Sequence, residues 1–380
     1  MKGHCDSGRS SRRGGRDGHV ASVAVGKYAG FMRPSLVRDH GLTEGQPMPL
    51  DVCTREFDSG ATTLFGMDPQ ILSVGIIQMP GGYGFGVRRY QAPGVIPLRR
   101  LNANTIAKVG AIAVEIRNVP GPVRPLLELP SSAANGPTNT STPEQARQRP
   151  LCLGSQLQNW DDDARAGLLN AERFVVGSLG FVLEREGGRL LVSNNHVLAG
   201  QNRGRLGDRI AQPGGARLDQ TQVIARLERF VALEPSPTNA RPRHGTVIWN
   251  HVDAAVARLS PGIDCDSGYV EARRLPTPRG FAGPVLNERV FKVGRTTGLR
   301  YGKIVGINER VGPIRYAVGN CWFRASFTIV GEDGQPFAEA GDSGAVVVRP
   351  SGELVGLIYA SNGVDTYACP ITEVLAQLEL

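Results

Sequence analysis

Ala340-Gly341-Asp342-Ser343-Gly344-Ala345 stands near the end of this 380-residue chain, directly before a run of three valines at 346–348. Glycines on both sides of the Asp-Ser pair allow a tight turn whose backbone amides converge on one point. An oxyanion formed when the serine attacks a carbonyl would be stabilised there, and losing one such donor typically costs about 2.7–4 kcal/mol of barrier. The same residue types are common in ordinary turns, so the motif alone does not separate a nucleophilic serine from a turn.

The order of the histidines along the chain favours the nucleophile. All six histidines precede Ser343, which excludes the order nucleophile, acid, histidine of the α/β-hydrolases. His196 follows an apolar run at 190–192 and a polar break, and Asp253 directly precedes the apolar run 254–257. Since 57 residues separate His196 from Asp253 and 90 separate Asp253 from Ser343, each interval has room for several strands. The order histidine, acid, serine is that of one known catalytic triad.

Other residues compete for the roles of acid and base. Asp264 and Asp266 are alternative acids, but they lie in a loop rich in Pro, Gly and Ser that is predicted to be solvated. His251 is the alternative base, although no apolar strand precedes it to hold it rigidly. Because each of these residues also has an ordinary interpretation in a loop or at a strand end, the triad is a hypothesis that geometry must test.

Over residues 151–380 the three segments resemble those of the trypsin/chymotrypsin-like serine peptidases. Gly294-Arg295-Thr296-Thr297-Gly298 adds a resemblance to a bacterial branch of that family, which is similar to the plant narrow-leaf-type trypsin-like peptidases. The resemblance implies a mostly β fold, a double six-stranded β-barrel of the chymotrypsin-like kind with a C-terminal helix. His196 and Asp253 would then lie on the first barrel and Ser343 on the second.

The resemblance also implies a mechanism. Ser343 would be the nucleophile, His196 its general base and Asp253 the group that orients the imidazole. The backbone amides of Gly341 and Ser343 would form the oxyanion hole. We expect a serine endopeptidase that hydrolyses a protein or peptide substrate through a covalent acyl-enzyme. No cofactor or metal is expected, because the histidines and cysteines lack ligand spacing. The alternative is a catalytically silent scaffold of the same fold that acts as a protein-binding module.

Departures from the family pattern concern specificity and activation. The residue six before the serine, which floors the primary pocket in trypsin-like relatives, is Phe337, and the wall segment contains Tyr359 and Ser361. These residues argue against cleavage after Arg or Lys and favour a shallow pocket for small or apolar side chains. In relatives that are activated by cleavage, the residue at the position of Asp342 pairs with the N-terminal amine that the cleavage frees. No such amine is evident here, so we expect activity without that cleavage.

Composition and patterning divide the chain into four parts. Residues 1–40 contain eight basic and three acidic residues, which supply +5 of the formal net charge of +8, and are predicted to be a disordered basic tail. Residues 41–129 are predicted to be a small β-rich module with a hairpin around a turn at 79–82. Residues 130–150 are predicted to be a linker, and 151–380 the peptidase domain.

Two elements of the peptidase domain are predicted individually. Residues 289–293 and 300–306 alternate as strands do and are predicted to pair as a hairpin. Residues 371–378 have apolar side chains at helical spacing and are predicted to be a terminal helix packed on the second barrel.

Charge and hydropathy bear on partners and location. The basic excess lies in the tail, so no nucleic acid is required as a partner. No run reaches the roughly 18 apolar residues of a membrane span, and no signal-peptide core is evident, so a cytoplasmic location is expected. For the N-terminal module, one hypothesis is an autoinhibitory contact that blocks the peptidase cleft.

Overall fold

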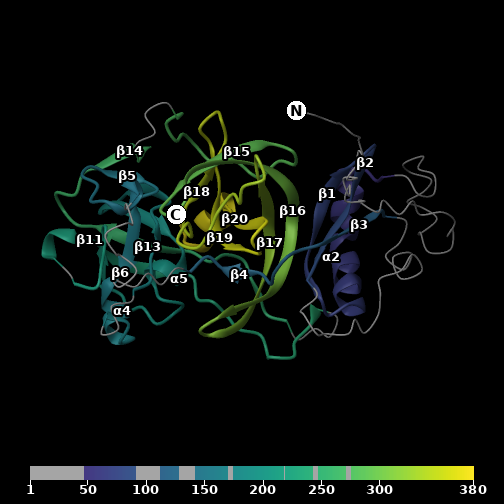
Figure 1. The fold of residues 1–380 in the computed structure, drawn as a ribbon, viewed down its shortest axis with the longest axis horizontal. Helices are drawn as coiled ribbons and strands as arrows, with labels where there is room; N and C mark the ends of the chain where they lie inside the picture. The colour runs from purple at the N-terminus through teal and green to yellow at the C-terminus, as the bar shows by residue number, and fades with distance from the viewer. Residues whose placement is uncertain are drawn as a thin grey trace, which may run out of the picture.

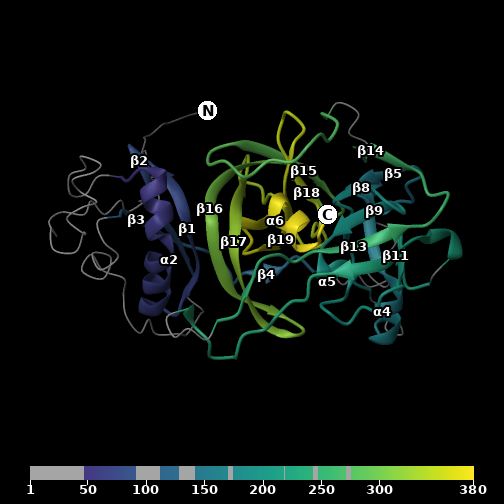
Figure 2. The same cartoon turned by 180° about the vertical axis from the view of Figure 1, so that it is seen from behind.

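A computed structural model describes residues 47–90, 112–127, 142–169, 174–217, 219–242, 247–270 and 275–380. The first barrel, the second barrel and an N-terminal segment lie in a row, coloured teal, green to yellow, and purple to blue (Figure 1). Figure 2 shows the same row from behind. The predicted basic tail, residues 1–40, lies outside the described residues, as does most of the predicted linker.

The first barrel is a seven-stranded sheet in the order β7-β6-β10-β11-β13-β9-β8. Its two outermost strands, β7 and β8, are joined by only two residues, so the sheet curves back on itself. Apolar side chains that alternate along the strands, such as Leu157, Leu191 and Ala225, are fully buried in its interior. The strands are β6 (Gln156–Asn159), β7 (Gly177–Ser178), β8 (Phe181–Arg185), β9 (Gly188–Ser193), β10 (Arg209–Ala211), β11 (Val223–Phe230) and β13 (Ala255–Leu259).

The second barrel closes completely. Its strands follow the order β17-β20-β19-β18-β15-β16, and β16 pairs back onto β17. The predicted double barrel is therefore confirmed, as is the hairpin of β15 and β16, whose ends meet at Gly294 opposite Gly298. The strands are β15 (Arg289–Gly294), β16 (Gly298–Tyr316), β17 (Gly319–Gly331), β18 (Val346–Val348), β19 (Leu354–Ser361) and β20 (Asp365–Pro370).

Shorter elements connect and cover the barrels. The predicted terminal helix is confirmed as α6 (Ile371–Gln377), whose Ile371 and Val374 are buried in the core of the second barrel. The others are β5 (Leu151–Leu153), paired with β14 (Cys265–Tyr269), β12 (Trp249–Asn250), α4 (Trp160–Arg165) and α5 (Asn195–Leu198). No helix within the described ranges is long and apolar enough to cross a membrane.

The N-terminal segment shares a sheet with the second barrel. The predicted hairpin is confirmed as β1 (Ile71–Met79) and β2 (Gly82–Arg89), and β1 also pairs with β16. An 18-residue helix, α2 (Leu50–Met67), packs on this hairpin through buried side chains that recur every three or four residues. The segment continues through β3 (Val114–Asn118), which pairs with β2, and β4 (Arg124–Pro125).

Candidate active site

His196 and Asp253 meet at one end of the first barrel. Strand β9 pairs with β13 so that Ser193 lies opposite Ala255, which brings the residues after β9 beside those before β13. The His196 backbone N–H donates to Asp253 Oδ1 over 3.1 Å, and its Nδ1 lies 2.5 Å from Asp253 Oδ2. Both side chains are fully buried. The imidazole is thus held in one orientation, with Nε2 directed away from the carboxylate.

The competing residues lie elsewhere. His251 is partly exposed, and its ring contacts Arg324 and lies 3.5 Å from Glu373. Asp264 has 86% of its side chain exposed, and Asp266 is also exposed at the start of β14. None of the three has a hydrogen bond or ion pair with His196 or Asp253 within the part of the chain that the structure describes.

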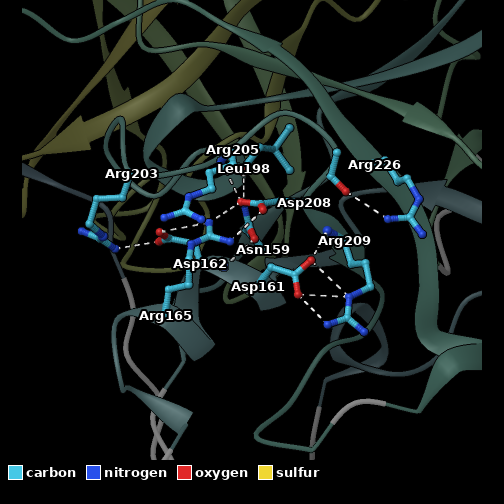
Figure 3. A network of polar contacts seen from close by, with 11 residues as sticks. Asn159, Asp161, Asp162, Arg165, Leu198, Arg203, Arg205, Asp208, Arg209 and Arg226 are labelled. Atoms are coloured by element: carbon cyan, nitrogen blue, oxygen red, sulfur yellow. Dashed lines mark hydrogen bonds and ion pairs between the residues drawn. The ribbon is translucent and has the colours of Figure 1, made fainter.

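A polar network holds the short helix α5 that carries His196 (Figure 3). Asn159 donates from Nδ2 to the Leu198 carbonyl over 2.7 Å and to Asp208 Oδ2 over 3.1 Å. Arg165 donates to Asp208 Oδ1 over 2.8 Å, and Arg203 donates to Asp162 Oδ2 over 2.7 Å. The last residue of α5 is therefore tied to Asn159, which ends β6 and caps α4.

Ser343 lies on the second barrel, against β7 of the first. Gly341 adopts φ +93°, a left-handed conformation that glycine tolerates best. Ser178 binds this loop twice, because its N–H donates to the Ser343 carbonyl over 2.7 Å and its Oγ donates to the Gly341 carbonyl over 3.1 Å. A Cβ added to Gly177 would lie 2.4 Å from Val197 Cγ2 and 2.8 Å from the Ser343 carbonyl oxygen. The residue after His196 and the backbone of Ser343 therefore flank the same glycine.

The side-chain atoms expected to exchange a proton are buried but are not bonded to each other. Among the described residues, neither Ser343 Oγ nor His196 Nε2 has a hydrogen-bond partner. The structure thus joins His196 to Asp253 and brings the Ser343 loop beside them without a bond between Ser343 and His196. Such bonds are often long in a resting enzyme and tighten only when substrate binds.

Asp342 is held by the Gly-Arg-Thr-Thr-Gly segment and by a buried lysine. Its Oδ1 accepts from the N–H groups of Thr296 and Thr297 over 2.8 and 3.1 Å. The Lys292 ammonium lies 2.9 Å from Asp342 Oδ2, and both side chains are fully buried. Burial would raise the pKa of Asp342, but the Lys292 charge and the hydrogen bonds outweigh it and hold this pKa below its ordinary range. The Lys292 ammonium thus pairs with Asp342, for which no N-terminal amine was expected as a partner.

Tyr316 was not among the predicted site residues. Tyr316 is the last residue of β16, and its hydroxyl donates to Asp253 Oδ2 over 2.8 Å. Burial, and secondarily the Asp253 charge, raise the pKa of Tyr316 well above its ordinary value, so the hydroxyl remains a donor at neutral pH. Nothing in the local sequence marks this tyrosine, because the contact joins residues 63 positions apart on two different barrels.

We expect Tyr316→Phe to lower kcat for peptide hydrolysis roughly tenfold to a hundredfold with KM little changed. The lost hydrogen bond to a carboxylate is worth about 1.5–3 kcal/mol. Tyr367→Phe is the matched control, because Tyr367 is equally buried but its hydroxyl contacts Ser73. An unchanged kcat in Tyr316→Phe, measured by steady-state kinetics, would show that Tyr316 does not position Asp253.

The residues that the resemblance assigns to specificity occupy different places. Phe337 is fully buried in an apolar cluster of the second barrel. The Tyr359 side chain points into another buried cluster, where its hydroxyl lies 2.9 Å from Ser326 Oγ, so only its backbone is available to a peptide on the edge of β19. Ser361 ends β19, and its Oγ accepts from the Gly363 N–H over 2.9 Å. Of the three side chains, Phe337 has the surroundings expected for the floor of an apolar pocket.

No protein-family model and no curated protein matches this chain. Its structural neighbours are bacterial serine proteases of the trypsin/chymotrypsin kind. They include protease A of Thermobifida fusca, with 18% identity, coverage of 54% of this chain and 89% of the other, and a TM-score of 0.36. Cellulomonas bogoriensis chymotrypsin has 19% identity, coverage of 53% of this chain and 87% of the other, and a TM-score of 0.35. Nocardiopsis protease has 17% identity, coverage of 61% of this chain and 97% of the other, and a TM-score of 0.40. Similarities this low assign neither an activity nor a substrate to this chain.

Proposed function

We propose that this chain is a serine endopeptidase that hydrolyses peptide bonds through a covalent acyl-enzyme. The observation that carries the proposal is the buried contact of 2.5 Å between His196 Nδ1 and Asp253 Oδ2, beside the loop of Ser343. A buried carboxylate against one nitrogen of an imidazole leaves the other nitrogen available as a base. The Gly294–Gly298 segment supports placing the chain in the bacterial branch that the sequence resembles, because it binds the residue before the nucleophile.

The proposed reaction uses only groups of this chain. His196 takes the proton from Ser343 Oγ as Oγ attacks the carbonyl carbon of the substrate, while Asp253 stabilises the imidazolium that forms. The N–H groups of Gly341 and Ser343 donate to the developing oxyanion. His196 then gives its proton to the leaving amine, and water hydrolyses the acyl-enzyme by the reverse sequence of proton transfers.

A fluorophosphonate probe, which reacts with activated serines, tests the proposal. We expect the probe to label wild-type protein at Ser343, as located by mass spectrometry of peptides, and to leave Ser343→Ala unlabelled. Ser267→Ala, at an exposed position on β14, is the control and should label as wild type does. If neither folded wild type nor folded Leu126→Glu, which should displace a segment bonded to Gly341, is labelled at Ser343, the catalytically silent scaffold is the better description.

A further inference from the structure

Residues 123–127, called here the strap, run from the N-terminal segment onto the second barrel. Strand β4 within the strap pairs antiparallel with the end of β19, so that Pro125 lies opposite Ala360 and Arg124 opposite Ser361. Figures 1 and 2 both show β4 on the second barrel, between the N-terminal segment and the first barrel. Pairing of an extended segment with a sheet edge is a general mode of peptide recognition. This edge of β19 is also the wall to which the resemblance assigns substrate binding.

Leu126 extends this pairing to the candidate oxyanion hole. Its N–H donates to the Tyr359 carbonyl over 3.1 Å. Its carbonyl oxygen accepts from the Gly341 N–H over 2.8 Å. Since Gly341 supplies one of the two amides assigned to the oxyanion hole, the Leu126 carbonyl lies where the carbonyl of a scissile bond is expected.

The Leu126 side chain is buried like that of a substrate in a pocket. It is 6% exposed and belongs to the apolar cluster that contains Phe337, Ala338 and Ile358. Removal of this leucine side chain from water favours this position of the strap. Residues 124–127 of the strap and residues 338–340 before Gly341 line one groove of about 680 Å³.

We propose that the strap is a peptide substrate of the chain's own site, and that Ser343 cleaves the bond between Leu126 and Leu127. The inference rests on the proposed function. Ser343 Oγ bonds to the Leu126 carbonyl carbon and passes its proton to His196. The C–N bond to Leu127 then breaks, and His196 protonates the released amine. Water hydrolyses the ester, which leaves a carboxylate on Leu126 and restores Ser343.

The same contacts define the external substrates of the site. They are extended peptides with leucine, or an apolar residue of similar size, before the scissile bond. Such a peptide would bind to the edge of β19 and to the apolar pocket that contains Phe337. The strap occupies both of these places. The uncleaved chain therefore excludes external peptides, which accords with the complete burial of Ser343.

The N-terminal fragment remains attached after the cut. Strand β1 stays paired with β16 through its main chain. Arg88 on β2 is buried and lies 2.7 Å from Glu309 Oε1 and 3.8 Å from Asp365 Oδ2, both of which belong to the second barrel. Separating the fragments would leave these charges unpaired, so we expect the two pieces to co-elute until the protein is unfolded.

Intact-mass measurement of the purified full chain over time tests the cleavage. We expect wild type to yield a fragment that ends at Leu126 and one that begins at Leu127, while Ser343→Ala stays a single chain. Leu126→Glu should stay whole, because a carboxylate does not enter the apolar pocket, and its displaced strap should let a fluorophosphonate label Ser343 at least about tenfold faster than in uncleaved wild type. If Leu126→Glu does not fold, Leu126→Ala replaces it. Leu126→Ala should cleave itself more slowly than wild type, and before cleavage its Ser343 should be labelled faster than that of uncleaved wild type.

Two further variants serve as controls. Leu50→Glu makes the same change on α2, where Leu50 is 37% exposed, and should be cleaved as wild type is. Leu126→Met keeps an apolar side chain of similar volume and should also be cleaved.

Each remaining outcome has a definite meaning. If wild type stays uncleaved and is labelled at Ser343 as fast as Leu126→Glu, the inference is overturned, whereas the proposed function still holds. Whole wild type that is labelled more slowly than Leu126→Glu overturns the cleavage, and so do fragments with other ends. Absence of label from Ser343 in every folded variant overturns the proposed function and the inference together.

Discussion

Replacing His196 by alanine is expected to lower kcat for hydrolysis of a leucine-containing peptide by a factor on the order of 10⁶. The size of the effect follows from the role of the imidazole, since a serine hydroxyl without a base is a poor nucleophile at neutral pH. His196 is buried against Asp253, and the described residues offer no second histidine in contact with that carboxylate. The measurement is steady-state hydrolysis with both proteins carrying Leu126→Glu, which displaces the strap without requiring self-cleavage, and folding is checked by circular dichroism.

His251→Ala is the matched control for this experiment. His251 lies two residues before Asp253 in the sequence, but its ring contacts Arg324 and Glu373 near the surface. We therefore expect kcat to remain at the wild-type level in His251→Ala. If instead His251→Ala abolishes hydrolysis and His196→Ala does not, the base has been assigned to the wrong histidine.

Replacing Lys292 by methionine is expected to lower the free energy of unfolding by about 3–5 kcal/mol. The change keeps most of the apolar length of the side chain but leaves the Asp342 carboxylate buried without its cation. Removing one partner of a buried pair costs far more than removing one partner of an exposed pair. Urea unfolding at neutral pH measures the difference.

Lys303→Met is the control, because Lys303 is exposed on β16 and its loss should change stability by no more than about 0.5 kcal/mol. The pH dependence adds an independent check. Since the pKa of Asp342 is lowered in the folded protein, its stabilising contribution is present above its ordinary value of 3.8 and is lost as the pH falls through the lowered value. The deficit of Lys292→Met should therefore shrink in acid, and a deficit that stays constant down to pH 3 would contradict the ion-pair explanation.

Local sequence patterns determined much of the fold. Alternating apolar residues and glycine turns were sufficient to predict the hairpin of β1 and β2 and that of β15 and β16, and the spacing of apolar residues predicted α6. These elements depend on residues close together in the chain, for which periodicity and turn chemistry are direct signals. The helix α2 was not predicted, because Gly60 and four threonines or serines lower the helix propensity of this segment.

The candidate site is divided in the same way. The order of His196, Asp253 and Ser343 was legible in the sequence, because each residue lies next to an apolar strand or a glycine turn. The three contacts that surround them were not, namely Lys292 with Asp342, Tyr316 with Asp253, and Leu126 with Gly341. These pairs join segments that are at least 50 residues apart and come together only when the barrels close and the strap lies on β19.

The sequence by itself thus determined the order of the three candidate residues and the apolar strands beside which they lie. Tertiary structure alone decided which charge pairs with Asp342, which hydroxyl donates to Asp253 and which segment pairs with the end of β19. The physical reason is that local propensities act over a few residues, whereas pairing across barrels depends on sheet closure and burial, to which no local pattern is sensitive.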